Sequence, residues 1–270
     1  DNSGYSVSLS ADGTRVAIGA YGNDGTNGTA SNAGHVRIYQ YISSSWTQLG
    51  TDIDGEASGD QSGISVSLSP DGTRVAIGAY GNDGTNGTAS NAGHVRIYEY
   101  SSGSWSKVGE DIDGEAASDY SGYSVSLSSD GTRVAIGAYR NDGTASNAGH
   151  VRIYEWNGSA WVQLGTDIDG EAEDDQSGYS VSLSSDGSRV AIGAPTNNGT
   201  GTVINAGHVR IYGYDSSTTD WVQLGFDIDG EAYYDQSGIS VSLSSDGTRV
   251  AIGANYHDSS KGHVRIYEYS

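Results

Sequence analysis

The sequence contains no cysteine and no methionine, and only one phenylalanine and two prolines among 270 residues. The absence of cysteine excludes a disulfide scaffold, although it does not exclude secretion. Apolar runs are only a few residues long, so we expect neither a membrane-spanning segment nor a signal-peptide core. Basic residues are also scarce, with 13 Lys and Arg against 34 Asp and Glu, which gives a formal net charge of −21. This charge argues against nucleic acids and anionic membranes as partners, because both require a basic surface.

The abundant residues point to strands and turns. Glycine alone accounts for 41 residues, and the apolar residues are mostly Val, Ile, Ala, Leu and Tyr. This mixture, together with many Ser, Thr and Asn residues, favours an all-β fold.

Internal repetition decides the fold class. The 28 residues 12–39 recur without change at 71–98, and the segment "SGYSVSLS" at Ser3 returns with small changes at Ser62, Ser121, Ser177 and Ser237. Each unit contains an alternating strand, a DG turn, the strand "TRVAIGA", a polar loop, the strand "GHVRIY" and a fourth strand such as "WTQLGTDI". Four antiparallel strands repeated radially form the blade of a β-propeller.

We therefore predict one β-propeller domain over 1–270, built from five blades of four antiparallel strands. The approximate blade boundaries are 1–59, 60–118, 119–174, 175–234 and 235–270. The fifth unit has no outer strand after "GHVRIYEYS". The alternative is that the chain forms part of a larger propeller or a tandem array. An open edge on the fifth blade would invite pairing with a neighbouring repeat segment or another molecule.

The repeat resembles the FG-GAP repeat of integrin α-subunit propellers. In "SGYSVSLSSDGSRVAIGAPTNNGTGTVINAGHVRIY" (177–212), the matching positions are Gly178, Ser180, Val181, Gly193, Ala194, Pro195, Gly207, Val209, Ile211 and Tyr212. Serine replaces the phenylalanine of the FG pair in all five units, and only the fourth unit retains the proline. The calcium loop that FG-GAP blades often carry between strands one and two is also absent, since that connection is only "SADGTR" at 10–15.

A second acidic motif, D-x-D-G-E-x-x-x-D, follows the fourth strand of four units and is the candidate metal site. Its carboxylates are Asp52, Asp54, Glu56, Asp60; Asp111, Asp113, Glu115, Asp119; Asp167, Asp169, Glu171, Asp175; and Asp227, Asp229, Glu231, Asp235. Carboxylates around a glycine can converge on calcium, which prefers six to eight oxygen ligands. The spacing fits no standard calcium loop, however, and the alternative is that these residues are solvated carboxylates and turn caps.

Other repeated residues have structural interpretations. We expect His35, Arg37 and their copies to pack between blades, and Arg15 and its copies to pair with nearby acids. The tryptophans that begin the fourth strands are expected to pack against the blade edge. Asn27, Asn86, Asn157 and Asn198 each begin an N-x-S/T sequon in a predicted loop, so they are candidate glycosylation sites if the protein is secreted.

The loops between the second and third strands should share one rim with the connections between blades. They cover 21–33, 80–92, 139–148, 195–206 and 255–261, and they vary in length while the strands do not. Function concentrates on such loops. The sequence contains no recognisable catalytic motif, so we predict a non-catalytic structural or adhesive repeat protein at the cell surface or outside it, forming a segment of a longer tandem array or filament. The alternative is a protein- or carbohydrate-binding module that uses the acidic rim, assisted by calcium.

Overall fold

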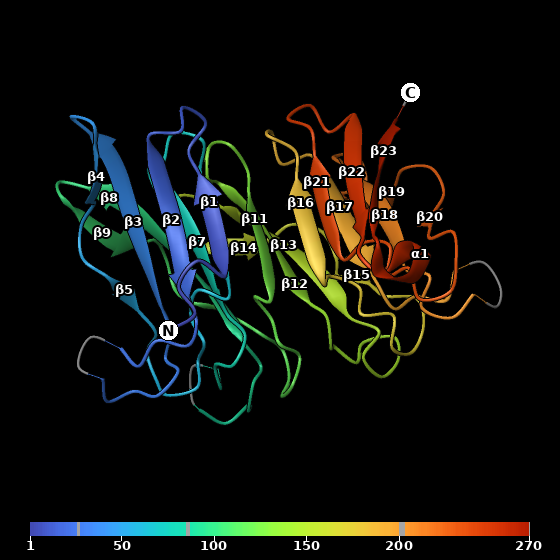
Figure 1. The fold of residues 1–270 in the computed structure, drawn as a ribbon, viewed down its shortest axis with the longest axis horizontal. Helices are drawn as coiled ribbons and strands as arrows, with labels where there is room; N and C mark the ends of the chain where they lie inside the picture. Colours follow the sequence, from blue (N-terminus) through green and yellow to red (C-terminus); the bar gives the residue numbers. More distant parts are fainter. Residues whose placement is uncertain (26–27, 85–86, 200–202, 270) are drawn as a thin grey trace. The chain divides into compact units, whose positions relative to one another are not determined.

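The computed structural model describes residues 1–25, 28–84, 87–199 and 203–269. Its sheets confirm the predicted all-β propeller of five blades, the fifth with three strands (Figure 1). The chain divides into two compact units. The first contains Asp1–Thr132 and Trp156–Trp161, and the second contains Arg133–Glu155 and Val162–Ser270. The third blade, made of β11 to β15, is shared between them.

The strands recur at equivalent positions in every blade. The first strands are β1(Ser6–Leu9), β6(Ser65–Leu68), β11(Ser124–Leu127), β16(Ser180–Leu183) and β21(Ser240–Leu243). The second strands are β2(Arg15–Ala20), β7(Arg74–Ala79), β12(Arg133–Ala138), β17(Arg189–Ala194) and β22(Arg249–Ala254). The third strands are β3(His35–Ile42), β8(His94–Ser101), β13(His150–Trp156), β18(His208–Asp215) and β23(His263–Glu268).

The fourth strand differs from the prediction because it is split in two. Its pieces are β4(Ser45–Gln48) and β5(Ile53–Asp54), β9(Ser104–Lys107) and β10(Ile112–Asp113), β14(Trp161–Gln163) and β15(Ile168–Asp169), and β19(Asp220–Gln223) and β20(Ile228–Asp229). In the first blade, β4 and β5 both pair with β3. Gly50 interrupts the strand between them at a φ of +80°, a left-handed conformation that glycine adopts without a steric penalty.

Asp-Gly turns join the first and second strands. In the first turn, Asp12 Oδ1 accepts hydrogen bonds from the Ser10 hydroxyl at 2.7 Å and the Thr14 N–H at 2.9 Å, while Gly13 has a φ of +68°. These bonds stabilise the carboxylate and lower the pKa of Asp12 to about 2. The local sequence is thus sufficient to fix this turn.

The hydrophobic core lies in layers between consecutive blades. In the first unit, Val36 and Ile38 of β3 in the first blade pack with Val66 and Leu68 of β6 in the second blade. The second strand of the second blade, β7, completes this layer. In the second unit, β13 contributes Val151 and Ile153 to the equivalent layer. The only helix in the described part of the chain, α1(His257–Ser260), lies in the predicted loop 255–261. This helix is not long and apolar enough to span a membrane.

Candidate functional site

The candidate site of each blade consists of the loop after its second strand and the connection that follows the blade. The third residue of each of four loops is an asparagine whose Oδ1 accepts a backbone N–H two residues later. The pairs are Asn23–Gly25 at 2.8 Å, Asn82–Gly84 at 2.8 Å, Asn141–Gly143 at 2.7 Å and Asn197–Gly199 at 2.6 Å. The loops therefore share one starting geometry although they differ in length.

The next residue of each loop closes it with a second bond. Its side-chain oxygen accepts the N–H of an asparagine near the end of the loop, in the pairs Asp24–Asn32 at 2.9 Å, Asp83–Asn91 at 2.9 Å, Asp142–Asn147 at 2.8 Å and Asn198–Asn205 at 3.0 Å. All four closing side chains belong to exposed residues. In the fourth blade an asparagine accepts this hydrogen bond in place of the aspartates of the other three blades. The bond that closes the loop therefore does not require a charged side chain.

Backbone hydrogen bonds tie each loop to the connection that follows the blade. The N–H groups of Gly59, Gln61 and Ser62 donate to the carbonyls of Ser31, Asn32 and Ala33 at 2.9, 3.0 and 2.9 Å. Gln61 adopts a φ of +57° in this contact, and Gln176 and Gln236 do the same at 58° and 54°. These bonds confirm that each loop lies beside the connection that follows its blade.

The last acid of each D-x-D-G-E-x-x-x-D motif is a buried turn cap. One carboxylate oxygen accepts the N–H three residues earlier, in the pairs Asp60–Ala57, Asp119–Ala116 and Asp175–Ala172 at 2.9 Å and Asp235–Ala232 at 3.0 Å. These aspartates are only 2–3% exposed. Each of these aspartates therefore stabilises the turn by which the chain leaves the fourth strand.

The first acid of each motif binds the end of its own fourth strand. Asp52 accepts from Gln48 at 2.6 Å and from Arg37 at 2.7 Å, and the bond from Arg37 is the main cause of its lowered pKa. The equivalent contacts are Asp111–Lys107 at 2.7 Å, Asp167–Gln163 at 2.6 Å and Asp227–Gln223 at 2.7 Å. The first acids therefore bridge the break between the two pieces of the strand.

The third acids, and the main-chain carbonyls of the second acids, contact the next blade. The second acids, Asp54, Asp113, Asp169 and Asp229, end the short strands, and the third acids, Glu56, Glu115, Glu171 and Glu231, are exposed just beyond them. Arg96 of the second blade donates to the Asp54 carbonyl at 2.8 Å and lies 3.3 Å from the Glu56 carboxylate. Arg210 makes the same pair of contacts with Asp169 at 2.7 Å and Glu171 at 3.7 Å. Arg96 and Arg210 therefore connect consecutive blades, as predicted, whereas Arg37 binds Asp52 of its own blade.

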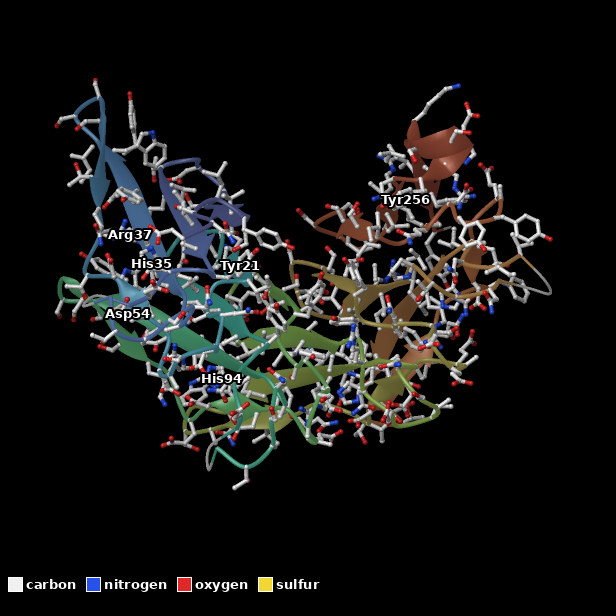
Figure 2. The ribbon with its side chains drawn as sticks, turned by 60° about the horizontal axis from the view of Figure 1, so that its bottom comes forward. Tyr21, His35, Arg37, Asp54, His94 and Tyr256 are labelled. Atoms are coloured by element: carbon white, nitrogen blue, oxygen red, sulfur yellow. The ribbon has the colours of Figure 1, made fainter. Side chains whose placement is uncertain are left out.

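Histidines lie beside these acids. Figure 2 shows His35 near Arg37 and Asp54 on the first blade, and ligand atoms of His35, Asp52 and Asp54 lie within 4.8 Å of one another. Two further groups, Glu56–His94–Asp111 and Glu171–His208–Asp227, combine a histidine with acids of two blades. In the last group, His208 Nδ1 is 3.9 Å from both carboxylates, which is too far for a hydrogen bond. Sequence reasoning missed these mixed groups because the glutamate comes from the preceding repeat.

Burial keeps these imidazoles neutral. Desolvation is the main cause, and the positive charge of the neighbouring arginine the second cause, of the lowered pKa values of His94 and His208. The same two causes lower the pKa of His150 to about 4. A neutral imidazole is a ligand for zinc and similar metals, whereas calcium takes oxygen ligands. The residues that could hold an ion are therefore suited to a metal that accepts mixed nitrogen and oxygen ligands.

A further histidine pair lies in the fifth blade. His257 and His263 stack with ring centroids 3.8 Å apart, and His257 Nδ1 is 2.9 Å from Asp235 Oδ2. Glu231 completes this group. Its second histidine comes from the shortened loop 255–261, so this blade differs from the others.

Two of the four sequons lie in described parts of the chain. Asn157 is exposed in a hairpin turn, where its Oδ1 accepts the N–H groups of Ser159 and Ala160 at 2.9 Å. Asn198 is the exposed residue that closes the fourth-blade loop. Asn27 and Asn86 lie outside the described residues. Glycosylation of any of these asparagines remains a prediction.

Comparisons with known proteins agree with the fold. Residues 112–154 match the family model of the FG-GAP repeat. No curated protein matches the chain. Among solved structures, the chain is similar to hydrazine synthase of Kuenenia stuttgartiensis, with a TM-score of 0.61 and 16% sequence identity over 97% of this chain and 70% of that one.

The likeness to solved structures concerns the fold alone. As many as 540 chains of solved structures match, and a fold shared so widely does not specify a function. The matched repeat and the five blades together identify this chain as an FG-GAP-like β-propeller.

Proposed function

We propose that this chain is a non-catalytic, adhesive binding protein that contacts its partner through several equivalent loops of one rim. The observation that supports this most directly is the shared hydrogen-bonded geometry of four loops. A catalytic site needs particular groups at one place, whereas this rim repeats the same amide, hydroxyl and carboxylate groups. Such repetition suits many weak contacts whose combined affinity exceeds that of any one of them.

The exposed groups of the rim indicate the class of partner. Amides and carboxylates bind hydroxyl groups and cations, and the net charge of −21 favours basic partners over acidic ones. The partner we propose is therefore a carbohydrate or a basic protein surface outside the cell. In that setting the chain would act within a longer array of such repeats or a filament.

A binding array tests this function. The labelled chain is applied to arrays of glycans and basic peptides, together with the triple variant Asp24→Asn, Asp83→Asn, Asp142→Asn. The natural Asn198 shows that asparagine can close the loop. Both variants are produced in a bacterial host that leaves the new N-G-T sequons unglycosylated, so only the charge of the loops changes. The control variant, Asp12→Asn, Asp71→Asn, Asp130→Asn, removes the same charge from the Asp-Gly turns between the first and second strands of the first three blades. We expect saturable binding that the first variant weakens and the control retains; no saturable binding on any array would contradict the proposal.

A second candidate function is cation-assisted binding. It is favoured by the group Glu171–His208–Asp227, in which the 3.9 Å separations leave room for an ion between the ligands. Calorimetric titration of the chelator-treated chain with CaCl2 and with ZnCl2 tests this function. Saturable heat that Glu171→Gln diminishes would support cation binding there, and an unchanged baseline with both metals would exclude it.

A further inference from the structure

The loop of the fifth blade carries a histidine, His257, at the position where the other four loops carry an asparagine. The equivalent residues are Asn23, Asn82, Asn141 and Asn197. In those loops the asparagine side chain accepts a backbone N–H of its own loop. His257 begins α1, shortly after the end of β22 (Figure 1). The replacement therefore brings an imidazole to a position that holds an amide in every other blade.

Two imidazoles and a carboxylate gather around this position. His257 stacks on His263, the third-strand histidine of the same blade, with ring centroids 3.8 Å apart and ring planes 23° apart. Glu231 is the third member, and one ligand atom of each of the three residues lies within 4.8 Å of the others. All three residues belong to the second unit. Each of the repeated groups contains only one histidine, so the second imidazole is particular to the fifth blade.

Asp235 determines which nitrogen of His257 can bind a ligand. Its Oδ2 lies 2.9 Å from Nδ1 of His257, and this aspartate is only 2% exposed. A carboxylate accepts hydrogen bonds, so Nδ1 carries the proton and Nε2 keeps its electron pair. Histidines that bind metals commonly donate their other ring N–H to a carboxylate, which fixes the tautomer and the orientation of the ring.

The imidazole of His263 has no hydrogen bond within the described residues. Its Nε2 is buried without a partner, and its Nδ1 lies 3.8 Å from Oε2 of Glu231, beyond hydrogen-bonding distance. Arg265 approaches the other oxygen of this carboxylate, with Nη1 3.7 Å from Oε1. Nδ1 of His263 and Oε2 of Glu231 therefore face each other without a direct bond, as two ligands of one ion do.

The donor atoms indicate the class of ion. Two imidazole nitrogens and a carboxylate oxygen suit Zn²⁺ and related transition metals, whereas Ca²⁺ takes oxygen ligands. Zinc–ligand distances of about 2.0–2.1 Å place tetrahedral ligands about 3.3 Å apart, so the three atoms need to approach by about 1.5 Å at most. The side chains of His257, His263 and Glu231 are 28%, 23% and 53% exposed, which leaves them room for this movement.

We propose that Glu231, His257 and His263 form a transition-metal site whose ion is Zn²⁺, with Asp235 as the positioning residue of His257. Three protein ligands leave a fourth position for water or for a donor atom of a bound partner. This inference goes beyond the proposed function because the site belongs to one blade and does not depend on equivalent loops. It also concerns other residues than the group of the second candidate function.

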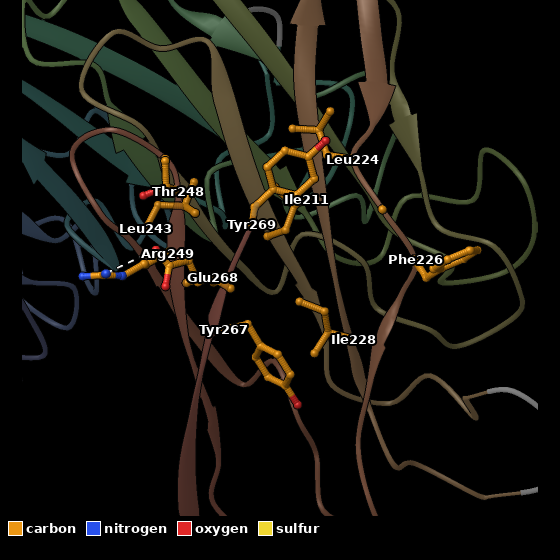
Figure 3. A pocket seen from close by; sticks show the side chains of 13 residues that line it. Ile211, Leu224, Phe226, Ile228, Leu243, Thr248, Arg249, Tyr267, Glu268 and Tyr269 are labelled. Carbon is orange, nitrogen blue, oxygen red and sulfur yellow. Dashed lines mark hydrogen bonds and ion pairs between the residues drawn. The ribbon is translucent and has the colours of Figure 1, made fainter.

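A carboxylate elsewhere in the fifth blade provides a matched control. Glu268 lies 3.2 Å from Arg249 beside a pocket whose apolar lining includes Ile211, Leu224 and Tyr267 (Figure 3). Among the described residues, Glu268 belongs to none of the histidine groups. Glu268→Gln therefore removes the same charge as Glu231→Gln and leaves the proposed ligands in place.

A zinc titration tests the site. Calorimetry with ZnCl2 at pH 7.5 uses the chain without a histidine tag. All chains are produced in a bacterial host, which leaves the N-D-S sequon created by His257→Asn unglycosylated. His257→Asn introduces the residue of the other four loops, and its thermal unfolding checks that the fold is retained.

We expect a saturable zinc equivalent that His257→Asn and Glu231→Gln each weaken at least tenfold, because the loss even of a residue that orients a ligand costs about 10–100-fold in affinity. Glu268→Gln should leave the affinity unchanged, and CaCl2 should not compete. Absence of saturable zinc binding, or zinc binding that His257→Asn leaves unchanged, would overturn the proposal.

Hydrogen exchange locates the ion without a substitution. Zn²⁺ should slow the exchange of residues 255–263 at least fivefold, since it would link the loop to β23, whereas CaCl2 at the same concentration should not. Protection confined to the histidines of other blades would contradict this location.

Discussion

At the scale of single residues, the buried histidines make the stability of the folded chain depend on pH. His94, His150 and His208 are each 1% exposed, and the guanidinium two residues later disfavours a second positive charge. The folded chain therefore prefers the neutral imidazole. An unfolded chain has no such preference, so protons bind preferentially to the unfolded state once the pH falls below the ordinary histidine value.

The first prediction concerns acid stability. Between the ordinary pKa of 6.5 and the folded value of about 4 for His150, the unfolded state binds more protons, so the free energy of unfolding decreases as the pH falls through this range. One such histidine accounts for roughly 3 kcal/mol by pH 4. Urea unfolding at pH 7.5 and pH 4.5 should show the loss, and His150→Gln should reduce the difference. An equal pH dependence in the unsubstituted chain and in His150→Gln would contradict the assignment.

Individual residues were only partly predictable. The prediction that the third-strand arginines pack between blades is correct for Arg96, Arg210 and Arg265, which each contact the preceding blade. It fails for Arg37, whose guanidinium binds Asp52 of its own blade. The prediction that the second-strand arginines pair with acids is correct for Arg74, which lies 3.1 Å from Glu99. It fails for Arg15, whose cross-strand neighbour is Gln40 and whose guanidinium donates to the Gly72 carbonyl at 2.9 Å. Contacts between blades depend on which strands become neighbours, and a strand pattern alone does not contain that information.

At the scale of the elements, the close approach of consecutive blades depends on a glycine in each second strand. A Cβ at Gly193 would collide with the carbonyl oxygen of Gly238, which belongs to the next blade. Gly253 is the equivalent glycine in the fifth blade, where an added Cβ would meet only atoms of Ser240. The two positions share a local sequence and differ in their neighbour.

The second prediction uses this matched pair. Gly193→Ala should destabilise the chain by about 3 kcal/mol or more, because a backbone oxygen cannot move aside as a side chain can. Gly253→Ala should cost about 1 kcal/mol or less, since the Ser240 hydroxyl can rotate. Thermal unfolding of both variants measures the difference. Equal loss in both would show that the glycine is needed for its strand rather than for blade packing.

Strand positions were predictable because each unit repeats the same period-2 pattern and the same Asp-Gly turn. The break in the fourth strand was not predicted, although Leu49 and Gly50 provide a signal for it. Its cause lies in another blade: the Leu49 carbonyl turns to accept the Trp105 indole, and Gly50 leaves space for that ring. Local pattern therefore predicts the elements, whereas contacts between repeats shape their ends.

At the scale of the whole molecule, charge is the dominant property. A net charge of −21 on 270 residues produces self-repulsion that opposes the compact state. Added salt screens this repulsion over a Debye length of about 10 Å at 0.1 M. The surface ion pairs that salt also weakens are worth at most about 1 kcal/mol each.

The third prediction follows from this balance. Raising NaCl from 10 mM to 300 mM should increase the midpoint of thermal unfolding, because screened repulsion outweighs the weakened ion pairs. Differential scanning calorimetry at constant pH measures the change. A midpoint that falls with salt would show that the ion pairs between blades, such as Arg96–Glu56, contribute more than the repulsion.

The central claim is that several equivalent loops each contribute part of the affinity for the partner. Its most direct test is the affinity of the single variants Asp24→Asn, Asp83→Asn and Asp142→Asn, and of the triple variant, for an immobilised partner from the binding array. Exposed charged contacts are worth about 0.2–1 kcal/mol, so each single change should weaken binding by about fivefold at most. The triple variant should weaken it by about the product of the three effects. Loss of all binding through one substitution, with the other two silent, would reveal a single unique site and contradict the account.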